Sequence, residues 1–244
     1  LAAQIMVILD ISVVNVALPS IGDALSFDST HFAWVVSAYV LLSGGLLLLG
    51  GRLADLFDRR RVFLAGVTLF TAASLASAVA VSPLMLIVSR AAQGVGAAML
   101  TPAALAIIVT TYSGRQRARA LAAWGTVGSM GIAAGVLVGG ALTAAFGWRA
   151  IFIINVPIGI AVAIATRRIV AAGRRTGHVR GLDLPGALTA VGGLLALVYA
   201  IDGASRDGWT SPVTVGALAV AAALLAAFAV IERRVPSPLI PPAT

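Results

Sequence analysis

The sequence lacks cysteine and lysine altogether, and charged residues make up only 11% of its 244 positions. Without cysteine it cannot form a disulfide scaffold, and without lysine it cannot contain the Gly-x-x-x-x-Gly-Lys phosphate loop. Intrinsically disordered chains and coiled coils are rich in charge, so the low charge content excludes both classes. Soluble domains carry about 25% charged residues, so this chain has too little polar surface to face water on all sides.

Apolar residues dominate what is present: they make up 60% of the chain, and the mean hydropathy is +1.03. They form runs, interrupted by charges, glycine or proline, that are long enough to cross about 30 Å of hydrocarbon as helices. The sequence therefore predicts an all-α, polytopic membrane protein in contact with lipid. We expect eight spans, at Leu1–Ile21, Phe32–Gly51, Val62–Val81, Leu84–Tyr112, Ala118–Phe146, Ala150–Thr166, Leu184–Ile201 and Pro212–Ile231.

Arginine is distributed unevenly between the loops. Alternate loops hold 14 of the 17 arginines, the other loops hold only Arg149 and Arg206, and Arg90 lies within a span. Because arginine-rich loops stay in the cytoplasm, this division predicts an inner-membrane protein with both ends of the chain cytoplasmic. The arginines form no single stripe, so nucleic acid is not an expected partner. The 14 are Arg52, Arg59, Arg60, Arg61, Arg115, Arg117, Arg119, Arg167, Arg168, Arg174, Arg175, Arg180, Arg233 and Arg234.

Tryptophan marks the opposite side of the membrane. Trp34, Trp148 and Trp209 all lie near predicted outer ends of spans. Tryptophan is enriched at membrane interfaces, where its ring sits at the level of the headgroups. We therefore expect these three side chains to anchor span ends in the outer interface.

Two segments of the chain match each other at a constant offset of 89 residues. In residues 50–63 and 139–152, a Gly-Gly pair, one leucine, two phenylalanines and one arginine coincide. Three spans separate the copies, and this odd number places them on opposite faces of the membrane. Inverted-topology repeats are typical of secondary transporters, whose halves move about a site near the bilayer midplane.

Four motifs carry a resemblance to a known family. They are Leu9–Pro19 in the first span, Gly51–Arg61 in the loop after the second, Arg90–Gly96 in the fourth span and Gly131–Gly140 in the fifth. Over nearly its whole length the chain resembles the N-terminal part of the major facilitator superfamily. Within that superfamily it most resembles the fourteen-helix drug:proton antiporters of the EmrB/QacA type.

The resemblance implies a domain organisation. Residues 1–166 would form a six-helix bundle of 3+3 inverted repeats, and residues 167–183 a cytoplasmic, arginine-rich loop. Residues 184–231 would form two additional central helices, followed by a cytoplasmic tail at 232–244. Six further helices would then be missing, and this C-terminal half would be the partner that completes the transporter. The sequence begins within an apolar run and without methionine, so we expect it to be a fragment.

Asp10 lies in the middle of the first span. A carboxylate at the bilayer centre costs about 2.5–3.5 kcal/mol on insertion scales, so we expect it to face a polar cavity. It would either carry a proton or make a structural hydrogen bond to a neighbouring helix. Arg90 lies at a similar depth, so we expect the two to pair, directly or through Gln93. The resemblance implies that Arg90 takes part in proton transfer, and the alternative is that it extends toward the outer interface.

Asp55 and the cluster Arg59, Arg60 and Arg61 lie at the predicted inner mouth of the second and third spans. Asp55 can pair with Arg59 or cap the N-terminus of the following helix. The resemblance implies that the four residues form a latch that closes the cytoplasmic side in one state. A short solvated loop whose arginines only orient the helices is the simpler alternative.

Two positions in this loop depart from the family pattern. Leu56 stands where family members often have a basic residue, which removes one contact of the latch. Asp58 stands where they usually have glycine. Aspartate tolerates left-handed backbone angles better than most residues, so we expect Asp58 to preserve the turn in that conformation.

The fifth span carries Gly128, Gly131, Gly135 and Gly139 along one face, with Gly140 beside them. A face of small residues lets another helix approach closely. The resemblance implies that this seam serves antiport by opening and sealing during the transport cycle, and close packing alone is the alternative. Val136 replaces the proline that the family usually has here, which removes the usual cause of a kink.

Several residues near the middle of their spans are candidates to line a substrate pocket. Their side chains are polar or polarisable and lie far from the predicted loops. Each could instead connect two helices within the bundle. The candidates are Asn15, Tyr39, Gln93, Met99 and Thr101.

Taken together, the sequence predicts a secondary active transporter that exports hydrophobic or cationic small molecules in exchange for protons. We expect no enzymatic activity, no metal and no cofactor, because no metal cluster or catalytic triad is available and His31 and His178 fall on opposite sides of the membrane. The proton gradient would supply the energy. One alternative is a sugar or metabolite symporter of the same superfamily, which the missing proline at Val136 leaves open. Another is a truncated, non-transporting membrane sensor or interaction module.

Overall fold

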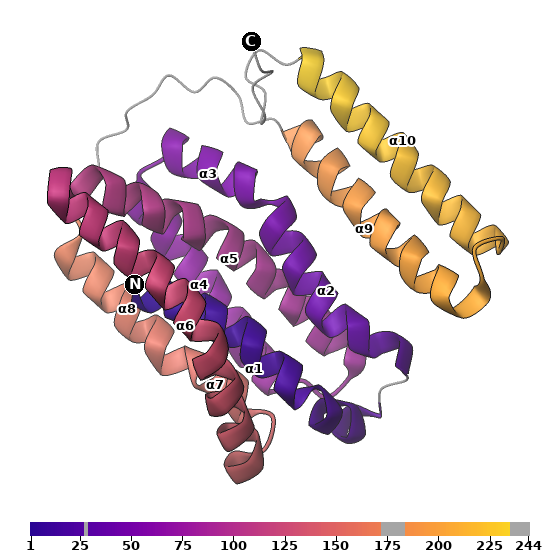
Figure 1. Ribbon diagram of the computed structural model, residues 1–244, viewed down its shortest axis with the longest axis horizontal. Coiled ribbons are helices and arrows are strands. Elements are labelled where there is room, and N and C mark those ends of the chain that lie inside the picture. Colours follow the sequence, from indigo (N-terminus) through magenta and orange to yellow (C-terminus); the bar gives the residue numbers. More distant parts are fainter. Residues whose placement is uncertain (27–28, 172–183, 235–244) are drawn as a thin grey trace.

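The computed structural model describes residues 1–26, 29–171 and 184–234, which are helical and contain no strand. Most of the predicted loop 167–183 and tail 232–244 therefore lies outside the described residues, as do Arg174, Arg175, His178 and Arg180. The helices, shown in Figure 1, are α1 (Ala2–Leu25), α2 (Ser29–Gly45), α3 (Leu47–Leu56), α4 (Arg59–Ala78), α5 (Pro83–Thr111), α6 (Gly114–Phe146), α7 (Ala150–Ile153), α8 (Asn155–Ile169), α9 (Leu184–Asp207) and α10 (Pro212–Arg234).

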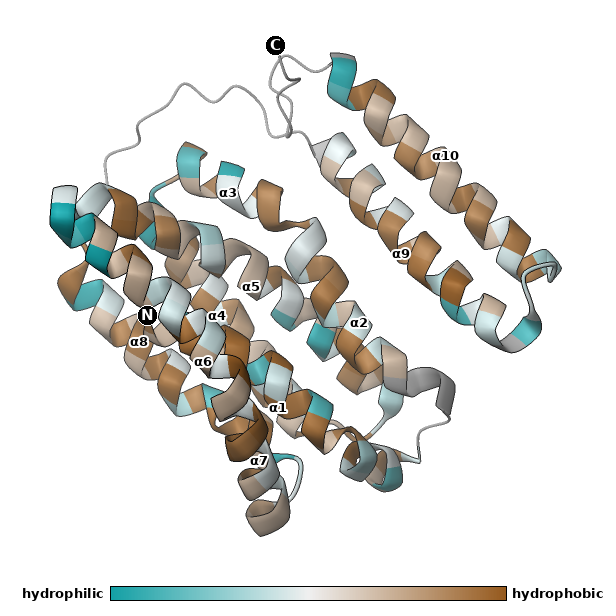
Figure 2. Ribbon diagram, in the orientation of Figure 1, coloured by the Kyte–Doolittle hydropathy of each residue, from teal (hydrophilic) through white to brown (hydrophobic). Residues whose placement is uncertain are grey.

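Among the described residues, seven helical segments are long and apolar enough to cross a membrane, and a bent pair forms an eighth candidate. The bent pair is α2 with α3, whose axes differ by 43° at a break beside Leu46. The prediction of eight spans is confirmed, with a bend in the second span that the sequence analysis did not anticipate. Hydrophobic residues line most of each helix, and hydrophilic ones gather toward the helix ends (Figure 2).

Capping residues explain where two helices of the bundle begin. Ser82 accepts a hydrogen bond from the Met85 N–H at 3.3 Å, and Pro83 follows in the first turn of α5, where its missing N–H leaves no helical bond unmade. Asp58 caps α4 and accepts from the Arg60 N–H at 3.0 Å. With φ −60° and ψ 117°, Asp58 is extended, so the expected left-handed conformation is wrong. An N-cap residue needs extended angles for its side chain to reach the free N–H groups.

The first six spans divide into two sets of three that exchange contacts. One set is α1, α2 with α3, and α4; the other is α5, α6, and α7 with α8. α2 and α3 pack on α5, and α6 packs on α1 (Figure 1). A Cβ at Gly50 would collide with the Ala98 carbonyl oxygen, and one at Gly139 would lie 2.9 Å from Val13 Cα. The two copies of the repeat thus place a glycine at equivalent close contacts between helices.

Two apolar clusters fill the interior of the bundle. One includes Met6 and Leu100, and the other includes Ile21 and Leu86. Along α1, α4 and α5, buried polar residues fall between the members of one cluster and those of the other. The bundle therefore has a polar layer enclosed between two apolar ones, and this layer contains the candidate site.

Trp148 belongs to the second of these clusters and does not face the membrane interface. It is only 5% exposed, and its ring packs edge-on against Phe152 with a centroid distance of 6.2 Å. The neighbouring Arg149 guanidinium lies 4.4 Å from the Trp148 ring and donates to the Ala80 carbonyl oxygen at 3.2 Å. The prediction that Trp148 anchors a span end is wrong, because these contacts hold the turn between α6 and α7 against the end of α4.

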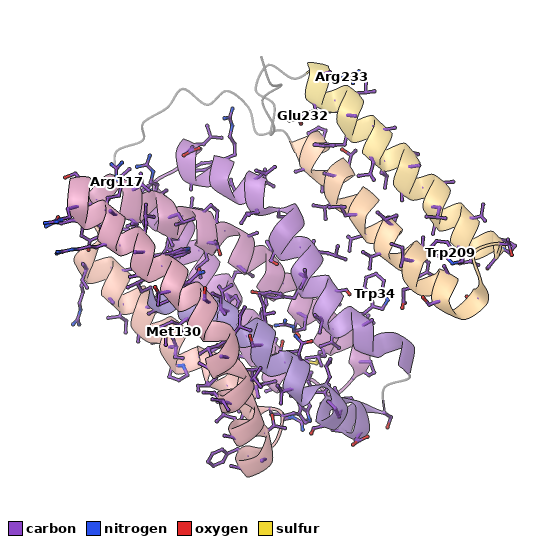
Figure 3. All side chains as sticks on the ribbon, in the orientation of Figure 1. Trp34, Arg117, Met130, Trp209, Glu232 and Arg233 are labelled. Atoms are coloured by element: carbon purple, nitrogen blue, oxygen red, sulfur yellow. The ribbon has the colours of Figure 1, made fainter. Side chains whose placement is uncertain are left out.

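α9 and α10 form an antiparallel hairpin beside α2 (Figure 1). Trp34 of α2 meets Tyr199 of α9 with ring centroids 6.3 Å apart, and a Cβ at Gly45 would lie 3.0 Å from Val191 Cγ2. In Figure 3, Arg117 and Arg233 lie at one end of the helices and Trp209 lies at the other. This separation agrees with the division of arginine and tryptophan in the sequence, and the orientation in the membrane stays a prediction.

Candidate functional site

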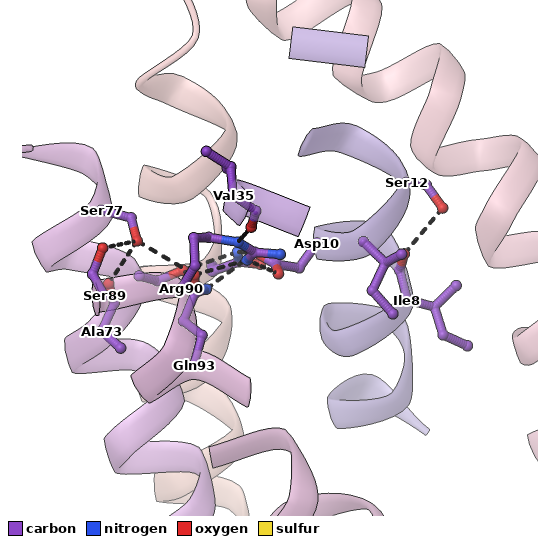
Figure 4. Close-up of polar contacts among 12 residues, drawn as sticks. Ile8, Asp10, Ser12, Val35, Ala73, Ser77, Ser89, Arg90 and Gln93 are labelled. Atoms are coloured by element: carbon purple, nitrogen blue, oxygen red, sulfur yellow. Dashed lines mark hydrogen bonds and ion pairs between the residues drawn. The ribbon is translucent and has the colours of Figure 1, made fainter. Parts of the chain in front are cut away.

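Asp10 of α1 and Arg90 of α5 form an ion pair inside the bundle, in which Arg90 Nη1 donates to Asp10 Oδ2 (Figure 4). Asp10 is 2% exposed and Arg90 is 1% exposed. The direct contact that the sequence predicts is present, and Arg90 does not extend to the interface. A role of the pair in proton coupling stays a prediction.

Two amide side chains complete the contacts of the Asp10 carboxylate. Gln93 Nε2 on α5 and Asn155 Nδ2 on α8 each donate to Asp10 Oδ1 at 3.1 Å. Both amides also donate to Ser74 Oγ on α4, at 2.8 Å and 3.1 Å respectively. Side chains from α5 and α8 therefore meet the carboxylate of α1, and Ser74 of α4 joins the two amides to each other.

Arg90 has two further acceptors. Its Nε donates to the Val35 carbonyl oxygen on α2 at 3.2 Å, and its Nη1 donates to Gln93 Oε1 at 2.8 Å. Ser77 Oγ also donates to Gln93 Oε1, at 3.4 Å, and lies 2.8 Å from Ser89 Oγ. Because the Gln93 oxygen accepts and its nitrogen donates, these contacts define the orientation of the amide.

The arrangement suits a charged pair. An ionised carboxylate can only accept hydrogen bonds, and the side chains around Asp10 all donate to it. Burying two charges costs several kcal/mol per ion, and their attraction offsets this only when the remaining donors and acceptors are also paired. The amides of Gln93 and Asn155 and the Val35 carbonyl supply that pairing.

Two of the predicted pocket residues lie at the ion pair. Gln93 and Tyr39 are each 0% exposed, and the Tyr39 ring centroid lies 4.3 Å from Arg90 Cζ. Their burial places them inside the bundle, in direct contact with the charged residues. A role for either in binding substrate stays a prediction.

The other three predicted pocket residues lie apart from the network. Asn15 is exposed on α1, and its amide donates to the Ile11 carbonyl oxygen at 2.9 Å. Met99 and Thr101 are half-buried on α5, where Met99 packs against the apolar cluster that contains Met6. Substrate contact stays a prediction for these residues too.

Asn155 and Ser74 are the members of the network that the sequence analysis missed. Asn155 could have been found, because it is the one amide in the predicted span 150–166 and polar groups within spans are candidates for function. Ser74 gave no such signal, since serine is common in membrane helices and bonds to their backbone.

The cytoplasmic-loop motif has a different arrangement from the expected one. Asp55 is exposed within the last turn of α3, and among the described residues it makes no ion pair with Arg59. Asp58, not Asp55, caps α4, because it is the residue that directly precedes that helix. Asp58 Oδ2 also lies 3.9 Å from Nε of Arg61, whose side chain is 81% exposed. Latching by Asp55, Arg59, Arg60 and Arg61 stays a prediction.

A cavity of about 720 Å³ lies beside this motif. Phe57, Arg59, Arg60 and Tyr112 are among the residues that line it, and none of the predicted pocket residues does. Arg60 Nη2 donates to the Arg167 carbonyl oxygen at 2.8 Å, which ties α4 to the end of α8. Within the described part of the chain, no group of three or more His, Cys, Asp or Glu side chains could hold a metal ion.

The glycine seam of α6 packs against α1. Gly131, Gly135 and Gly139 are buried, and a Cβ at Gly135 would lie 2.5 Å from Ser12 Cβ. Figure 4 shows Ser12 on the side of α1 that faces away from Arg90. The seam therefore packs against α1 on the side that faces away from Arg90. Gly140 lies at its edge, where a Cβ would be 4.0 Å from Val16 Cγ1.

Helical spans in inverted repeats around a buried polar layer define the class of this protein: a multi-pass membrane protein with the architecture of a secondary transporter. The sequence profile of the Major Facilitator Superfamily matches residues 1–231. The chain belongs to this superfamily, which consists of transporters and not of enzymes.

Several similar proteins are named for antibiotic resistance or export. The chain is 46% identical to puromycin resistance protein pur8 of Streptomyces alboniger, over 99% of this chain and 48% of that protein. It is 44% identical to cephamycin export protein CmcT of Amycolatopsis lactamdurans, over 98% of this chain and 50% of that protein. The chain thus spans about half the length of these relatives.

Solved structures share the fold at lower identity. An auto-inhibited POT family peptide transporter superposes with a TM-score of 0.63 at 18% identity, over 94% of this chain and 50% of that one. A bacterial homologue of the human lysosomal transporter Spinster gives a TM-score of 0.61 at 20% identity, over 94% of this chain and 59% of that one. These similarities establish the fold of the chain.

Proposed function

We propose that this chain is the N-terminal portion of a proton-coupled exporter of hydrophobic or cationic compounds that works by alternating access. The relatives named for puromycin resistance and cephamycin export support export as the direction of transport. A C-terminal half would complete the substrate pathway. The proton gradient would drive the cycle without a cofactor or metal, and arginine-rich loops would keep both ends of the chain in the cytoplasm.

The observation that carries proton coupling is the buried ion pair of Asp10 and Arg90. Because Arg90 keeps its charge, only Asp10 can gain and lose a proton within the pair. Protonation removes the charge–charge attraction between the two side chains and weakens the hydrogen bonds that the amides of Gln93 and Asn155 donate to Asp10. These amides come from different helices, so the proton on Asp10 changes contacts between helices and thereby favours one conformation over another.

Two further elements would take part in the conformational change. The exposed Asp55, with Arg59, Arg60 and Arg61, would latch the cytoplasmic side in one state through contacts with the C-terminal half. The seam of Gly131, Gly135, Gly139 and Gly140 would hold α1 and α6 together while the bundle moves.

Everted membrane vesicles that contain the full-length transporter test this proposal. Their lumen corresponds to the outside of the cell, so an acidified lumen should make an antiporter accumulate ethidium or puromycin. Asp10→Asn keeps a polar side chain of similar size but cannot titrate, so this variant should only equilibrate the substrate. Asp23→Asn removes an exposed acid from the same helix and should accumulate substrate like the parent. Full accumulation by Asp10→Asn would show that the proton binds elsewhere.

Symport is a second candidate, which α6 favours. Val136 occupies the position where proline would kink the helix, and α6 runs unbroken over Gly114–Phe146. In the same vesicles a symporter would accumulate substrate only when the medium, and not the lumen, is acidic. Absence of gradient-driven movement under both conditions would instead favour a non-transporting sensor or interaction module.

A further inference from the structure

Arg90 poses a problem that the proton cycle itself creates, and the inference drawn from it rests on the proposed function. A guanidinium group stays protonated in proteins, so Arg90 keeps its charge when Asp10 becomes neutral. Arg90 is 1% exposed and cannot reach water without a large movement. A buried charge that has lost its partner is strongly unfavourable unless other groups stabilise it.

The groups in contact with Arg90 come from four helices. Apart from Asp10 of α1, α2 supplies Tyr39 and the Val35 carbonyl, α5 supplies the Gln93 amide oxygen, and α7 supplies Phe152. The serine of α4 and the asparagine of α8 bond to Gln93 or Asp10 and carry no charge. Within the described part of the chain, Asp10 and Tyr39 are therefore the titratable groups of this environment. Once Asp10 is neutral, no negative charge remains beside the guanidinium.

Tyr39 is placed to stabilise the guanidinium in that state. Its ring centroid lies 4.3 Å from Arg90 Cζ, closer than the Phe152 centroid at 5.9 Å. Val35 lies one helical turn before Tyr39, so a single turn of α2 offers Arg90 both a carbonyl oxygen and an aromatic face. The helices can approach because α5 has Gly94 here, where a Cβ would lie 2.6 Å from the Tyr39 carbonyl oxygen.

The hydroxyl group of Tyr39 plays no visible part in the network. Tyr39 Oη is buried and has no hydrogen-bond partner among the described residues. The ring is fixed instead by packing, with Phe70 of α4 in an edge-on contact at a centroid distance of 6.4 Å. The face of the ring is therefore the feature that Arg90 meets.

We propose that Tyr39 is a positioning residue that holds the Arg90 guanidinium by a cation–π contact during the protonated half of the cycle. The attraction between a cation and an aromatic face is strongest when the cation is desolvated and has no counter-ion nearby. The ring thus contributes more when Asp10 is neutral than when it is ionised. Tyr39 thereby stabilises the state of the transport cycle in which Asp10 is neutral and Arg90 has lost its counter-ion.

The sign of the effect follows directly. Weakening the aromatic face destabilises the state with neutral Asp10, so protonation then needs a higher proton concentration. The pH midpoint of transport should fall, by about one unit for loss of a contact that shifts the equilibrium roughly tenfold. Tyr39→Phe keeps the ring face and should leave the midpoint unchanged.

Fluorinated phenylalanines at position 39 of the full-length transporter test this directly. Each added fluorine withdraws electrons from the ring face with little change in shape, so folding should be preserved. We expect the pH midpoint of ethidium accumulation in everted vesicles to fall stepwise from phenylalanine through its mono-, di- and trifluorinated forms. The same series at Phe70 is the control. Phe70 packs against Tyr39 and makes no described contact with Arg90, so this series should leave the midpoint unchanged.

The outcomes separate this inference from the proposed function. A parent protein with gradient-driven transport and a flat fluorine series at position 39 would overturn the role of Tyr39 alone. Tyr39→Leu removes the ring and should lower the pH midpoint. A shift of the midpoint in Tyr39→Phe as large as that in Tyr39→Leu would also overturn the role of Tyr39, because the hydroxyl group or the packing, and not the ring face, would then matter. A parent protein without proton coupling would overturn the proposed function and this inference with it.

Discussion

Asp10 and Asp58 each pair with an arginine, one inside the bundle and the other at its end. The Asp10 pair is almost fully buried, and amides from two other positions complete its hydrogen bonds. Asp58 lies 3.9 Å from Arg61, whose side chain is 81% exposed, and it also accepts a hydrogen bond from the Arg60 backbone N–H. The same two residue types therefore form one pair in which both side chains are buried and one in which only the aspartate is buried and the arginine is exposed.

The difference explains why only the Asp10–Arg90 pair suits energy coupling. When one partner is exposed to water, an ion pair contributes about 0–1 kcal/mol, so the contact of Asp58 with the exposed Arg61 side chain contributes little. Inside the bundle, removing one partner leaves the other charged and buried, which costs about 3–5 kcal/mol. A proton that binds to Asp10 thus changes the energy of the bundle enough to shift a conformational equilibrium.

Removing Arg90 should cause the largest loss of stability. Arg90→Leu leaves Asp10 buried without its partner and should lower the free energy of unfolding by about 3–5 kcal/mol. The double variant Asp10→Leu with Arg90→Leu should recover most of that loss, because no charge then remains in the layer. Chemical unfolding in detergent measures both. Equal stability of the single and double variants would mean that water reaches the Asp10–Arg90 pair.

Asn155→Leu should have the next largest effect. It removes an amide that donates to both Asp10 and Ser74, and hydrogen bonds to charged groups contribute about 1.5–3 kcal/mol. We expect a loss near the upper end of this range in the same unfolding assay. Asn155→Gln keeps the amide and should lose less. A loss as large for glutamine as for leucine would indicate that packing, and not the hydrogen bond, matters here.

These predictions also show which parts of the polar layer follow from sequence. Asp10 and Arg90 stand out because each is a charge within an apolar run, so their pairing could be predicted without a structure. Asn155 and Ser74 are neutral, and only the packing of α8 against α1 and α4 brings Asn155 to the carboxylate and Ser74 to the amides. The burial of Trp148 likewise depends on contacts between distant segments, which hydropathy does not encode.

The fold follows from sequence more completely than the site does. Run length gives the spans, and the offset of 89 residues between the Gly-Gly pairs gives the inverted repeat. The glycine pattern of α6 predicts a close helix contact but not its partner, which the structure identifies as α1. The backbone angles of Asp58 were wrongly predicted because a capping residue and a turn residue draw on the same amino acids.

Overpacking the glycine seam between α6 and α1 should disturb the Asp10–Arg90 pair indirectly. Gly139→Ala places a Cβ 2.9 Å from Val13 Cα, a backbone atom, so α1 or α6 must shift. We expect a loss of about 2 kcal/mol in unfolding free energy. Gly128→Ala is the matched control, because its nearest neighbour would be a flexible side-chain atom at 3.8 Å. Similar losses for both variants would contradict the close contact at Gly139.

Changes at the Asp58–Arg61 pair should have the smallest effects on stability. Asp58→Ala removes the cap of α4 and should cost about 1 kcal/mol. Arg61→Ala should stay within about 0.5 kcal/mol of the parent, since its side chain is mostly exposed. Thermal unfolding of both variants checks this order. A larger loss for Arg61→Ala than for Asp58→Ala would show that the ion pair outweighs the cap.

Substrate-induced proton release tests the central claim about Asp10 most directly. The purified full-length transporter, in weakly buffered detergent solution, is mixed with ethidium while a pH indicator follows the solution. If substrate and proton compete through Asp10, the parent should release protons on binding and Asp10→Asn should bind ethidium without releasing any. Equal proton release by the parent and by Asp10→Asn would contradict the assignment of Asp10 as the proton site.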